Sequence, residues 1–269
     1  MESGADGVGL FRIEELYFAR ELPPSEEELF SELQHLVAPL REKPVTIRLL
    51  DIGGDKAVPY LRLPFESNPL LGKRGVRLLL DYPQLARTQL KGLLRLSQAQ
   101  DIRILVPMVT FEREMQQMRE LLVAVAREMG IQNLPPLGAM IETPAAALTV
   151  GQIARYSDFF SVGTNDLTQY TLVAGRDDAT VSDYYDETHS SILRLLGIII
   201  GEASGKPVTI CGEMAGREEV IPTLLELGFR ALSISPQLIP TTKGLIRSIH
   251  AKDSFVNRHH NDGSQVPLA

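Results

Sequence analysis

Arginine residues recur in or beside short apolar segments of this 269-residue chain, where they could bind an anion. Arg12 ends one apolar segment, Arg48 lies within a second, and Arg74 opens a third. Arg176 follows at some distance from a later segment. Guanidinium groups form paired hydrogen bonds with phosphate and carboxylate groups. If the fold brings these segments together, the arginines would form a site for a ligand that carries such groups.

Two carboxylates, Glu142 and Asp166, end or follow two further apolar segments. Mg²⁺ is commonly bound by one or two protein carboxylates together with substrate oxygens, whereas Zn²⁺ sites use His and Cys. The pair therefore has the composition of a Mg²⁺ site. Helix capping is an equally good interpretation of Asp166, because Asp is favoured at helix N-termini and a helical segment follows. The sequence leaves both uses open.

The chain has one cysteine, Cys211, at the end of an apolar segment and before Gly212 and Glu213. A free cysteine is most often a small buried apolar residue. Because a thiol of ordinary pKa is mostly protonated at neutral pH, Cys211 could instead act as a general acid or, if activated, as a nucleophile. No histidine lies close in sequence, which disfavours a protease-like nucleophile. A lone cysteine forms no internal disulfide, as expected in a reducing cytosol.

Eight short, mostly continuous apolar segments are typical of strands buried on both faces. They alternate with segments of helical periodicity, which predicts a single-domain α/β fold, a (β/α)₈ TIM barrel. An open doubly wound sheet would show the same alternation, and the strand count favours the barrel. Several of the polar residues named above, among them Arg12, Glu142 and Cys211, fall at the carboxyl ends of the strands, where barrels place function. The predicted strands are 9–12, 45–51, 74–78, 102–107, 137–142, 159–163, 208–211 and 231–235.

Helix boundaries are marked at several places between the predicted strands. Ser25 and Glu28 have the spacing of a capping box. Thr110 is predicted to cap another helix, and Thr143 precedes a proline that suits the first helical position. Gly228 is predicted to end a helix. The barrel is predicted to occupy residues 1–250, followed by a polar C-terminal tail or linker over residues 251–269.

The composition is that of an ordinary folded domain, with 44% hydrophobic and 23% charged residues. Lys and Arg number 27 against 34 Asp and Glu, a net charge of −7, which argues against a nucleic-acid-binding surface. The longest apolar runs are shorter than a membrane span, and the N-terminus lacks the pattern of a signal peptide. We therefore expect a cytoplasmic protein without membrane insertion.

Six sequence motifs occur in a fixed order along the chain and together are highly specific, and most of the polar residues named above lie in them. The chain resembles the C-terminal phosphoenolpyruvate-binding barrel of the phosphoenolpyruvate–protein phosphotransferases, the enzyme I family of the bacterial sugar phosphotransferase system. Pyruvate phosphate dikinase and phosphoenolpyruvate synthase have a related barrel, but segment 51–56 is closer to enzyme I. The resemblance covers about residues 4–250. Its motifs are GVGLFRIE (7–14), DIGGDK (51–56), NPLLGKR (68–74), ETPA (142–145), GTNDLTQY (163–170) and CGE (211–213).

The resemblance implies that the barrel binds phosphoenolpyruvate, passes its phosphoryl group to a histidine and releases pyruvate. Arg12 and Arg48 would hold the phosphate, with Arg74 as a further cation nearby. Asn165 would donate a hydrogen bond to the phosphate, and Arg176 would contact the substrate. Asp166 would contribute to the same substrate site.

The resemblance also implies a cofactor and an acid. Glu142 and Asp166 would match the Mg²⁺ ligands, which favours metal binding over helix capping. Cys211 would match the acid that protonates the enolate carbon as pyruvate forms.

The motifs of the barrel begin within the first residues, so we expect a fragment of a longer protein without the domain that bears the phospho-accepting histidine. The expected partners are that phosphohistidine domain and, downstream, a histidine-containing carrier protein. In relatives a helical C-terminus supports dimerisation, and the polar tail leaves a homodimer open here. Two other functions stay open: a phosphoenolpyruvate-sensing regulatory module, and a dikinase- or synthase-type barrel that works with a nucleotide-binding domain.

Overall fold

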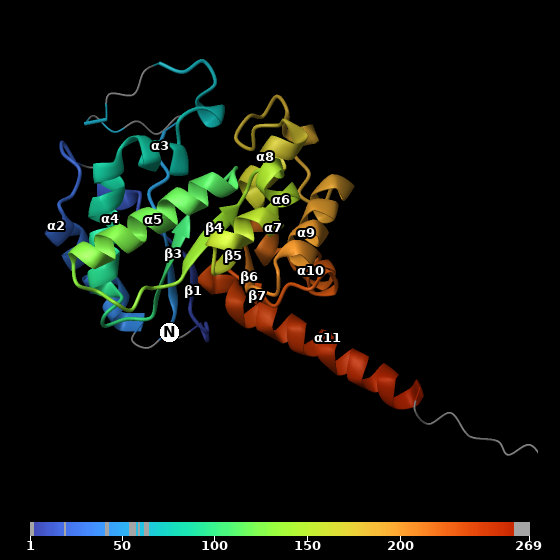
Figure 1. Cartoon of the computed structure of the whole chain (residues 1–269). Coiled ribbons are helices and arrows are strands. Elements are labelled where there is room, and N and C mark those ends of the chain that lie inside the picture. Colours follow the sequence, from blue (N-terminus) through green and yellow to red (C-terminus); the bar gives the residue numbers. More distant parts are fainter. Residues whose placement is uncertain are drawn as a thin grey trace, which may run out of the picture.

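Seven parallel strands form one sheet in the part of the chain that the computed structural model describes, namely residues 3–18, 20–40, 43–53, 58, 60–61 and 65–260. Each strand pairs with the next one along the chain, so their spatial order is their sequence order (Figure 1). The strands are β1 (Val8–Arg12), β2 (Val45–Arg48), β3 (Ile102–Val106), β4 (Leu137–Ile141), β5 (Phe159–Gly163), β6 (Val208–Cys211) and β7 (Ala231–Leu232).

The sheet curls until its two edges almost meet. A Cβ atom placed on Gly9 of β1 would lie 2.6 Å from the Cβ atom of Ser233, which directly follows β7. The two edges therefore approach too closely at this point for any residue larger than glycine. This nearly closed barrel of parallel strands confirms the predicted TIM-barrel type of fold, with seven strands described where eight were predicted.

The predicted strand at 74–78 is wrong, because this segment begins a helix. Gly75 has a φ of +54°, a conformation that favours glycine, and leads into α3 (Val76–Asp81). β2 pairs directly with β3, so the sheet has no strand between them. The apolar residues of this segment are nevertheless buried. A short apolar run fits a buried strand or a buried helix face equally well, and here the glycine turn decides the outcome.

Helices alternate with the strands and cover the outside of the barrel (Figure 1). They bury β4 and β5 along their whole length, which explains why these strands read as continuous apolar runs. The helices besides α3 are α1 (Glu15–Phe18), α2 (Glu26–Val37), α4 (Pro83–Leu96), α5 (Glu112–Glu128), α6 (Pro144–Leu148), α7 (Val150–Ile153), α8 (Thr164–Leu172), α9 (Ser190–Glu202), α10 (Ile221–Leu227) and α11 (Ile239–His260).

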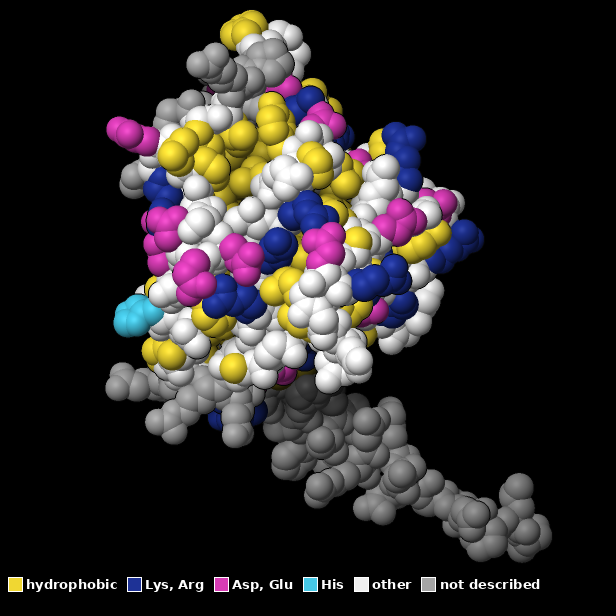
Figure 2. All heavy atoms as spheres, turned by 60° about the vertical axis from the view of Figure 1, so that its left-hand side comes forward, with side chains coloured by type: hydrophobic (Ala, Val, Ile, Leu, Met, Phe, Trp, Pro, Cys, Tyr) yellow, Lys and Arg dark blue, Asp and Glu magenta, His cyan; other side chains and the backbone are white. Residues whose placement is uncertain are grey.

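Ion pairs connect neighbouring helices of this outer layer. Arg87 of α4 pairs with Glu128 of α5, and Arg95 of α4 lies 2.6 Å from Glu27 of α2. Figure 2 shows charged side chains of both signs interspersed over the face that it presents. This part of the surface therefore carries no field of a single sign.

Most of the predicted helix boundaries are confirmed. Ser25 and Glu28 form a reciprocal capping box at the start of α2, and Thr143 accepts a hydrogen bond at the start of α6. Gly228 ends α10 with a φ of +107°. The capping role predicted for Thr110 is wrong, because Glu114 accepts hydrogen bonds from the backbone N–H groups before α5. The Glu114 carboxylate thus caps the start of α5 in place of the Thr110 hydroxyl.

The last helix, α11, continues to His260, past the predicted end of the barrel at residue 250 (Figure 1). The predicted tail therefore begins as a helix, and residues 261–269 lie outside the described residues. Among the described helices, none combines the length and the apolar character that crossing a membrane requires.

Candidate active site

A cavity of about 780 Å³ opens at the carboxyl ends of the strands. It brings together seven of the eight predicted site residues, which come from strand ends, the segments after them and the first turn of α8. The eighth, Arg74, lies beside the cavity and binds one of the lining residues. The seven are Arg12, Arg48, Glu142, Asn165, Asp166, Arg176 and Cys211.

The parallel sheet explains why residues far apart in sequence meet here. Arg12 and Arg48 are the last residues of β1 and β2 and lie opposite each other in register. Cys211 ends β6 and lies opposite Gly163, the last residue of β5. Because all strands run in one direction, their carboxyl ends form a single rim, and polar residues at those ends converge.

Arg48 is a buried cation held by acidic neighbours. Its Nη2 atom donates to Glu14 Oε1 at 2.8 Å, and its Nη1 atom lies 3.5 Å from Asp51 Oδ2. Burial opposes the charge, but Glu14, Asp51 and Glu142 outweigh burial and raise the pKa of Arg48. The Nε atom is buried and has no hydrogen-bond partner among the described residues. This N–H group is the donor of Arg48 that the described residues leave unsatisfied.

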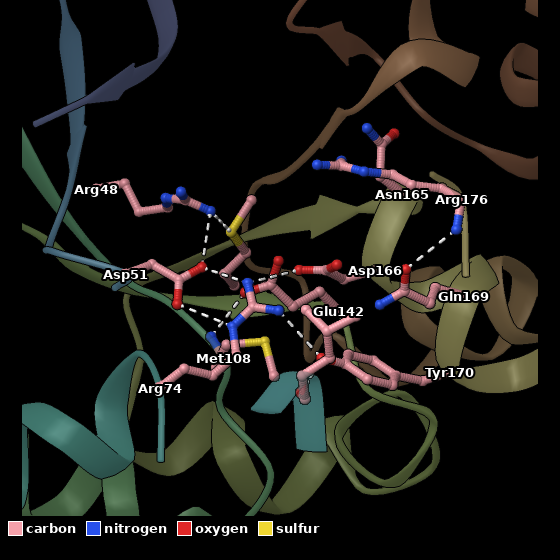
Figure 3. A network of polar contacts seen from close by, with 12 residues as sticks. Arg48, Asp51, Arg74, Met108, Glu142, Asn165, Asp166, Gln169, Tyr170 and Arg176 are labelled. Carbon is pink, nitrogen blue, oxygen red and sulfur yellow. Dashed lines mark hydrogen bonds and ion pairs between the residues drawn. The ribbon is translucent and has the colours of Figure 1, made fainter. Parts of the chain in front are cut away.

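Arg74 lies between three partners (Figure 3). It donates from Nε and Nη2 to the two carboxylate oxygens of Asp51, at 3.1 and 2.7 Å. Nη2 is also 3.1 Å from Asp166 Oδ2, and Nη1 donates to the Tyr170 hydroxyl at 3.1 Å. Tyr170 in turn donates to the carbonyl oxygen of Leu70 at 2.6 Å. Each of the three guanidinium nitrogens of Arg74 thus has a protein partner, unlike those of Arg48.

Asp166 does not cap a helix. The N-cap of α8 is Gly163, and Asp166 lies in the first turn with its carboxylate on Arg74. Glu142 does not cap α6 either, because Thr143 occupies that position. The capping interpretation of Asp166 is therefore wrong.

Glu142 is a buried carboxylate whose charge is disfavoured. It is 2% exposed, and its Oε1 atom accepts a hydrogen bond from the backbone N–H of Met108 at 2.6 Å. Burial and the nearby charge of Asp166 together raise the pKa of Glu142 to about 8. Among the described residues, no three His, Cys, Asp or Glu side chains are grouped so that they could hold a metal ion.

Cys211 is 2% exposed, is among the residues that line the cavity, and lies beside strand β5. Its thiol donates to the carbonyl oxygen of Val162 at 3.2 Å and accepts from the Ser161 hydroxyl at 3.4 Å. Burial raises the pKa of Cys211 to about 11. The group is therefore a protonated thiol at neutral pH, as a proton donor must be.

Asn165, Arg176 and Arg12 offer further donors to the cavity. Asn165 Oδ1 accepts from the backbone N–H of Glu213 at 2.9 Å, which fixes the side-chain amide. The backbone N–H of Arg176 donates to Gln169 (Figure 3), and the Arg176 side chain lies 3.3 Å from Asp177. Arg12 forms no hydrogen bond or ion pair with any residue that the structure describes. Its charge is therefore not neutralised by those residues.

Glu14, Asp51 and Tyr170 were not among the predicted site residues, yet they bind the two buried arginines. Glu14 and Asp51 lie inside the quoted motifs, two residues after Arg12 and three after Arg48. Their closeness to the predicted strand ends was the sequence feature that could have identified Glu14 and Asp51 as site residues. Which carboxylate binds which arginine depends on how neighbouring strands align, and this information comes only from the fold.

Gly212 is a point where a small change should disturb the site. Its φ is +98°, and a Cβ atom there would lie 2.2 Å from Thr164 Oγ1 and 2.6 Å from Asn165 Oδ1. Gly212→Ala should therefore lower the free energy of unfolding by about 1–3 kcal/mol. In Gly201→Ala, a helical control where a Cβ meets nothing within 4 Å, stability should not fall. Equal melting temperatures for the two variants would contradict this packing.

The buried thiol should leave a signature in the pH dependence of stability. In the unfolded chain it titrates near its ordinary pKa of 9.0, and in the fold near 11. Because the fold favours the protonated form, this contribution is complete below pH 9 and is lost as pH rises through about 11. The loss amounts to about 3 kcal/mol. Urea unfolding of Cys211→Ala should show a shallower decline over this range, and identical pH profiles would contradict the assignment.

Comparison with known proteins supports the sequence motifs. The chain matches, over residues 1–251, the family described as PEP-utilising enzyme, PEP-binding domain, where PEP is phosphoenolpyruvate. A phosphoenolpyruvate-protein phosphotransferase of Priestia megaterium is 43% identical over 94% of this chain and 45% of that protein. Proteins of the same name from Listeria monocytogenes and Haemophilus influenzae are 42% and 40% identical, over 93% and 94% of this chain and 45% of each protein. The chain thus spans about half the length of these relatives.

A solved structure supports the fold alone. RipC from Yersinia pestis matches with a TM-score of 0.52 and 14% identity, over 90% of this chain and 89% of that chain. The family match, in contrast, covers nearly the whole chain at the level of sequence. The protein therefore belongs to the family of phosphoenolpyruvate-utilising enzymes, with the barrel as its phosphoenolpyruvate-binding domain.

Proposed function

We propose that the barrel binds phosphoenolpyruvate and supplies the substrate site of a phosphoenolpyruvate–protein phosphotransferase. The observation that carries the proposal is Arg48, whose Nε atom is buried and unpartnered among the described residues while its side chain lines the cavity. A buried N–H group without an acceptor is costly, so an anion that supplies one binds favourably. The names of the relatives, phosphoenolpyruvate-protein phosphotransferases, support phosphoenolpyruvate as that anion.

Phosphoenolpyruvate carries a phosphate and a carboxylate, and the cavity offers several donors to them. Arg12 would hold the phosphate through paired hydrogen bonds, and Arg48 would donate to it from Nε. The amide of Asn165 would donate to the same group, since its oxygen is already engaged by the backbone of Glu213. Arg176, on the loop after α8, would contact the rest of the substrate. These roles follow the motif positions and agree with where the side chains lie.

Arg74 would act beside the phosphate rather than as a free binding cation. It is already bonded to Asp51 and Asp166, so its charge is shared with those carboxylates. In this proposal Arg74 orients Asp166 and contributes positive charge near the substrate. Its contacts with Asp51 are paired, which makes that end of the guanidinium rigid.

Glu142 and Asp166 have the chemistry of a divalent-cation site. Their charges lie close enough that Asp166 raises the pKa of buried Glu142, and a cation shared by the two would relieve this repulsion. Two carboxylates are typical protein ligands of Mg²⁺, which takes its other ligands from substrate oxygens and water. Bound Mg²⁺ would supply positive charge to the substrate oxygens. We therefore propose Mg²⁺ as the cofactor, with Glu142 and Asp166 as its protein ligands.

The chain's own residues would then perform two tasks. Arg12 and Arg48 would stabilise the phosphoryl group while its bond to the enol oxygen breaks and a bond to a histidine nitrogen forms. Cys211 would donate its thiol proton to the terminal carbon of the enolate, which gives pyruvate. A thiol with a raised pKa stays protonated until this step. The resulting thiolate regains its proton from water before the next cycle.

The phospho-accepting histidine and the downstream carrier protein are proposed as partners, and the cytoplasm as the location. Reconstitution tests the activity. The chain is mixed with the part of the Priestia megaterium relative that it does not match, and pyruvate is followed with lactate dehydrogenase. We expect phosphoenolpyruvate-dependent pyruvate release together with an acid-labile phosphohistidine, and neither when one component is omitted. Binding of phosphoenolpyruvate without either product would contradict the transferase and favour a sensing role.

A further inference from the structure

Glu14 lies at the turn between β1 and α1, outside the set of described residues that line the cavity. Its side chain is 7% exposed. The turn is fixed by the start of the helix, because the backbone N–H of buried Tyr17 donates to the Glu14 carbonyl oxygen at 2.9 Å. The position of Glu14 is therefore set by the fold before any ligand binds.

One oxygen of Glu14 connects two points at the end of β2. Oε1 accepts from Arg48 Nη2 at 2.8 Å and from the backbone N–H of Asp51 at 3.2 Å. The other oxygen, Oε2, is buried and has no hydrogen-bond partner among the described residues. A buried carboxylate with an unpaired oxygen is unfavourable, and a well-packed apolar pair would be at least as stable. Stability alone does not explain a glutamate at this place.

The two contacts of Glu14 determine which donor of Arg48 remains free. Glu14 occupies Nη2, while Nη1 lies near Asp51 Oδ2 at 3.5 Å and Met140 Sδ at 3.8 Å. Asp51 is held in turn through its backbone N–H, again by Glu14. Because the guanidinium is planar and rigid, fixing its two terminal nitrogens fixes the direction of Nε, the donor that has no partner.

We infer that Glu14 is a positioning residue for substrate binding, which aims the Nε edge of Arg48 at the phosphate of phosphoenolpyruvate and holds the Asp51 segment in place. The inference rests on the proposed function of the cavity. The feature that matters is the location of the Glu14 acceptor atom, and the negative charge is secondary. Asp at this position keeps the charge but loses one methylene of reach, whereas Gln loses the charge and keeps the acceptor.

Calorimetric titration with phosphoenolpyruvate and Mg²⁺ separates the two properties. We expect Glu14→Asp to weaken binding by about tenfold or more, because small misplacements of a binding group are costly. Glu14→Gln should weaken it by less, about threefold at most, because its amide oxygen still reaches Arg48 and Asp51. Glu226→Gln, on the exposed side of α10, is the matched surface control and should bind like the wild type.

Both the dissociation constant and the stoichiometry are determined for each variant. A residue that only supports folding would lower the stoichiometry, because fewer molecules could bind, and would leave the dissociation constant of the remaining molecules unchanged. Binding by Glu14→Asp equal to or tighter than that by Glu14→Gln would overturn the inference. Unchanged affinity in both variants would overturn it as well. Failure of the wild-type chain to bind phosphoenolpyruvate would instead overturn the proposed function, so the two failures are distinguishable.

Discussion

Arg12→Ala should weaken phosphoenolpyruvate binding by about 10- to 100-fold, the value of one or two hydrogen bonds to a charged group. The effect should appear without a loss of stability, because Arg12 is exposed and forms no hydrogen bond or ion pair with the residues that the structure describes. Arg48 offers no such clean test. Its removal would leave the buried carboxylates Glu14 and Asp51 without their cation, which is strongly destabilising.

The measurement is a calorimetric titration beside a thermal melt of each variant. Arg155→Ala is the control, since Arg155 is a mostly exposed arginine of the outer layer, with a single weak contact to Glu112 at 4.0 Å. Both variants should melt at the wild-type temperature, and only Arg12→Ala should lose affinity. Equal affinity of the two variants would remove Arg12 from the phosphate site.

Cys211→Ala should reduce pyruvate release by about 10²- to 10⁴-fold, the range of a missing general acid, while phosphoenolpyruvate binding stays close to that of the wild type. The thiol is buried and protonated at neutral pH. It therefore supplies a proton to the reaction and no charge that would bind the substrate. Release is measured in the reconstituted assay and binding by calorimetry, which separates the chemical step from affinity.

Ser161→Ala is the matched control for this prediction. It removes the hydroxyl that donates to the Cys211 sulfur at 3.4 Å but leaves the thiol and its bond to Val162 in place. Pyruvate release should fall by less than about tenfold in this variant, because the proton donor is still present. If Cys211→Ala released pyruvate as fast as Ser161→Ala, another group would have to protonate the enolate.

The fold was largely accessible from sequence because parallel strands that are buried on both faces leave continuous apolar runs. Seven of the predicted segments are strands, and helix boundaries such as the Ser25–Glu28 capping box are local signals that need no tertiary context. The error at 74–78 has a physical origin. The six residues of α3 are too few to show helical periodicity. The sequence also does not show that Gly75 adopts a positive φ.

The residues that form the site could be predicted from the sequence, but the contacts between their side chains could not. Residues at the carboxyl ends of parallel strands must converge, and so Arg12, Arg48, Glu142 and Cys211 line one cavity. The sequence could not reveal that Arg74 is neutralised by Asp51 and Asp166, while the described residues leave one donor of Arg48 without a partner. That difference depends on side-chain distances across the rim, which motif order and spacing do not determine.

The central claim is that this cavity binds phosphoenolpyruvate together with Mg²⁺. Its most direct test is a calorimetric titration of the chain with phosphoenolpyruvate, first with Mg²⁺ and then with a chelator, repeated for Glu142→Gln. We expect saturable binding at one site per chain that weakens when Mg²⁺ is removed, and no response to Mg²⁺ in the variant. No binding under either condition, or equal binding with Mg²⁺ and with chelator, would contradict the account.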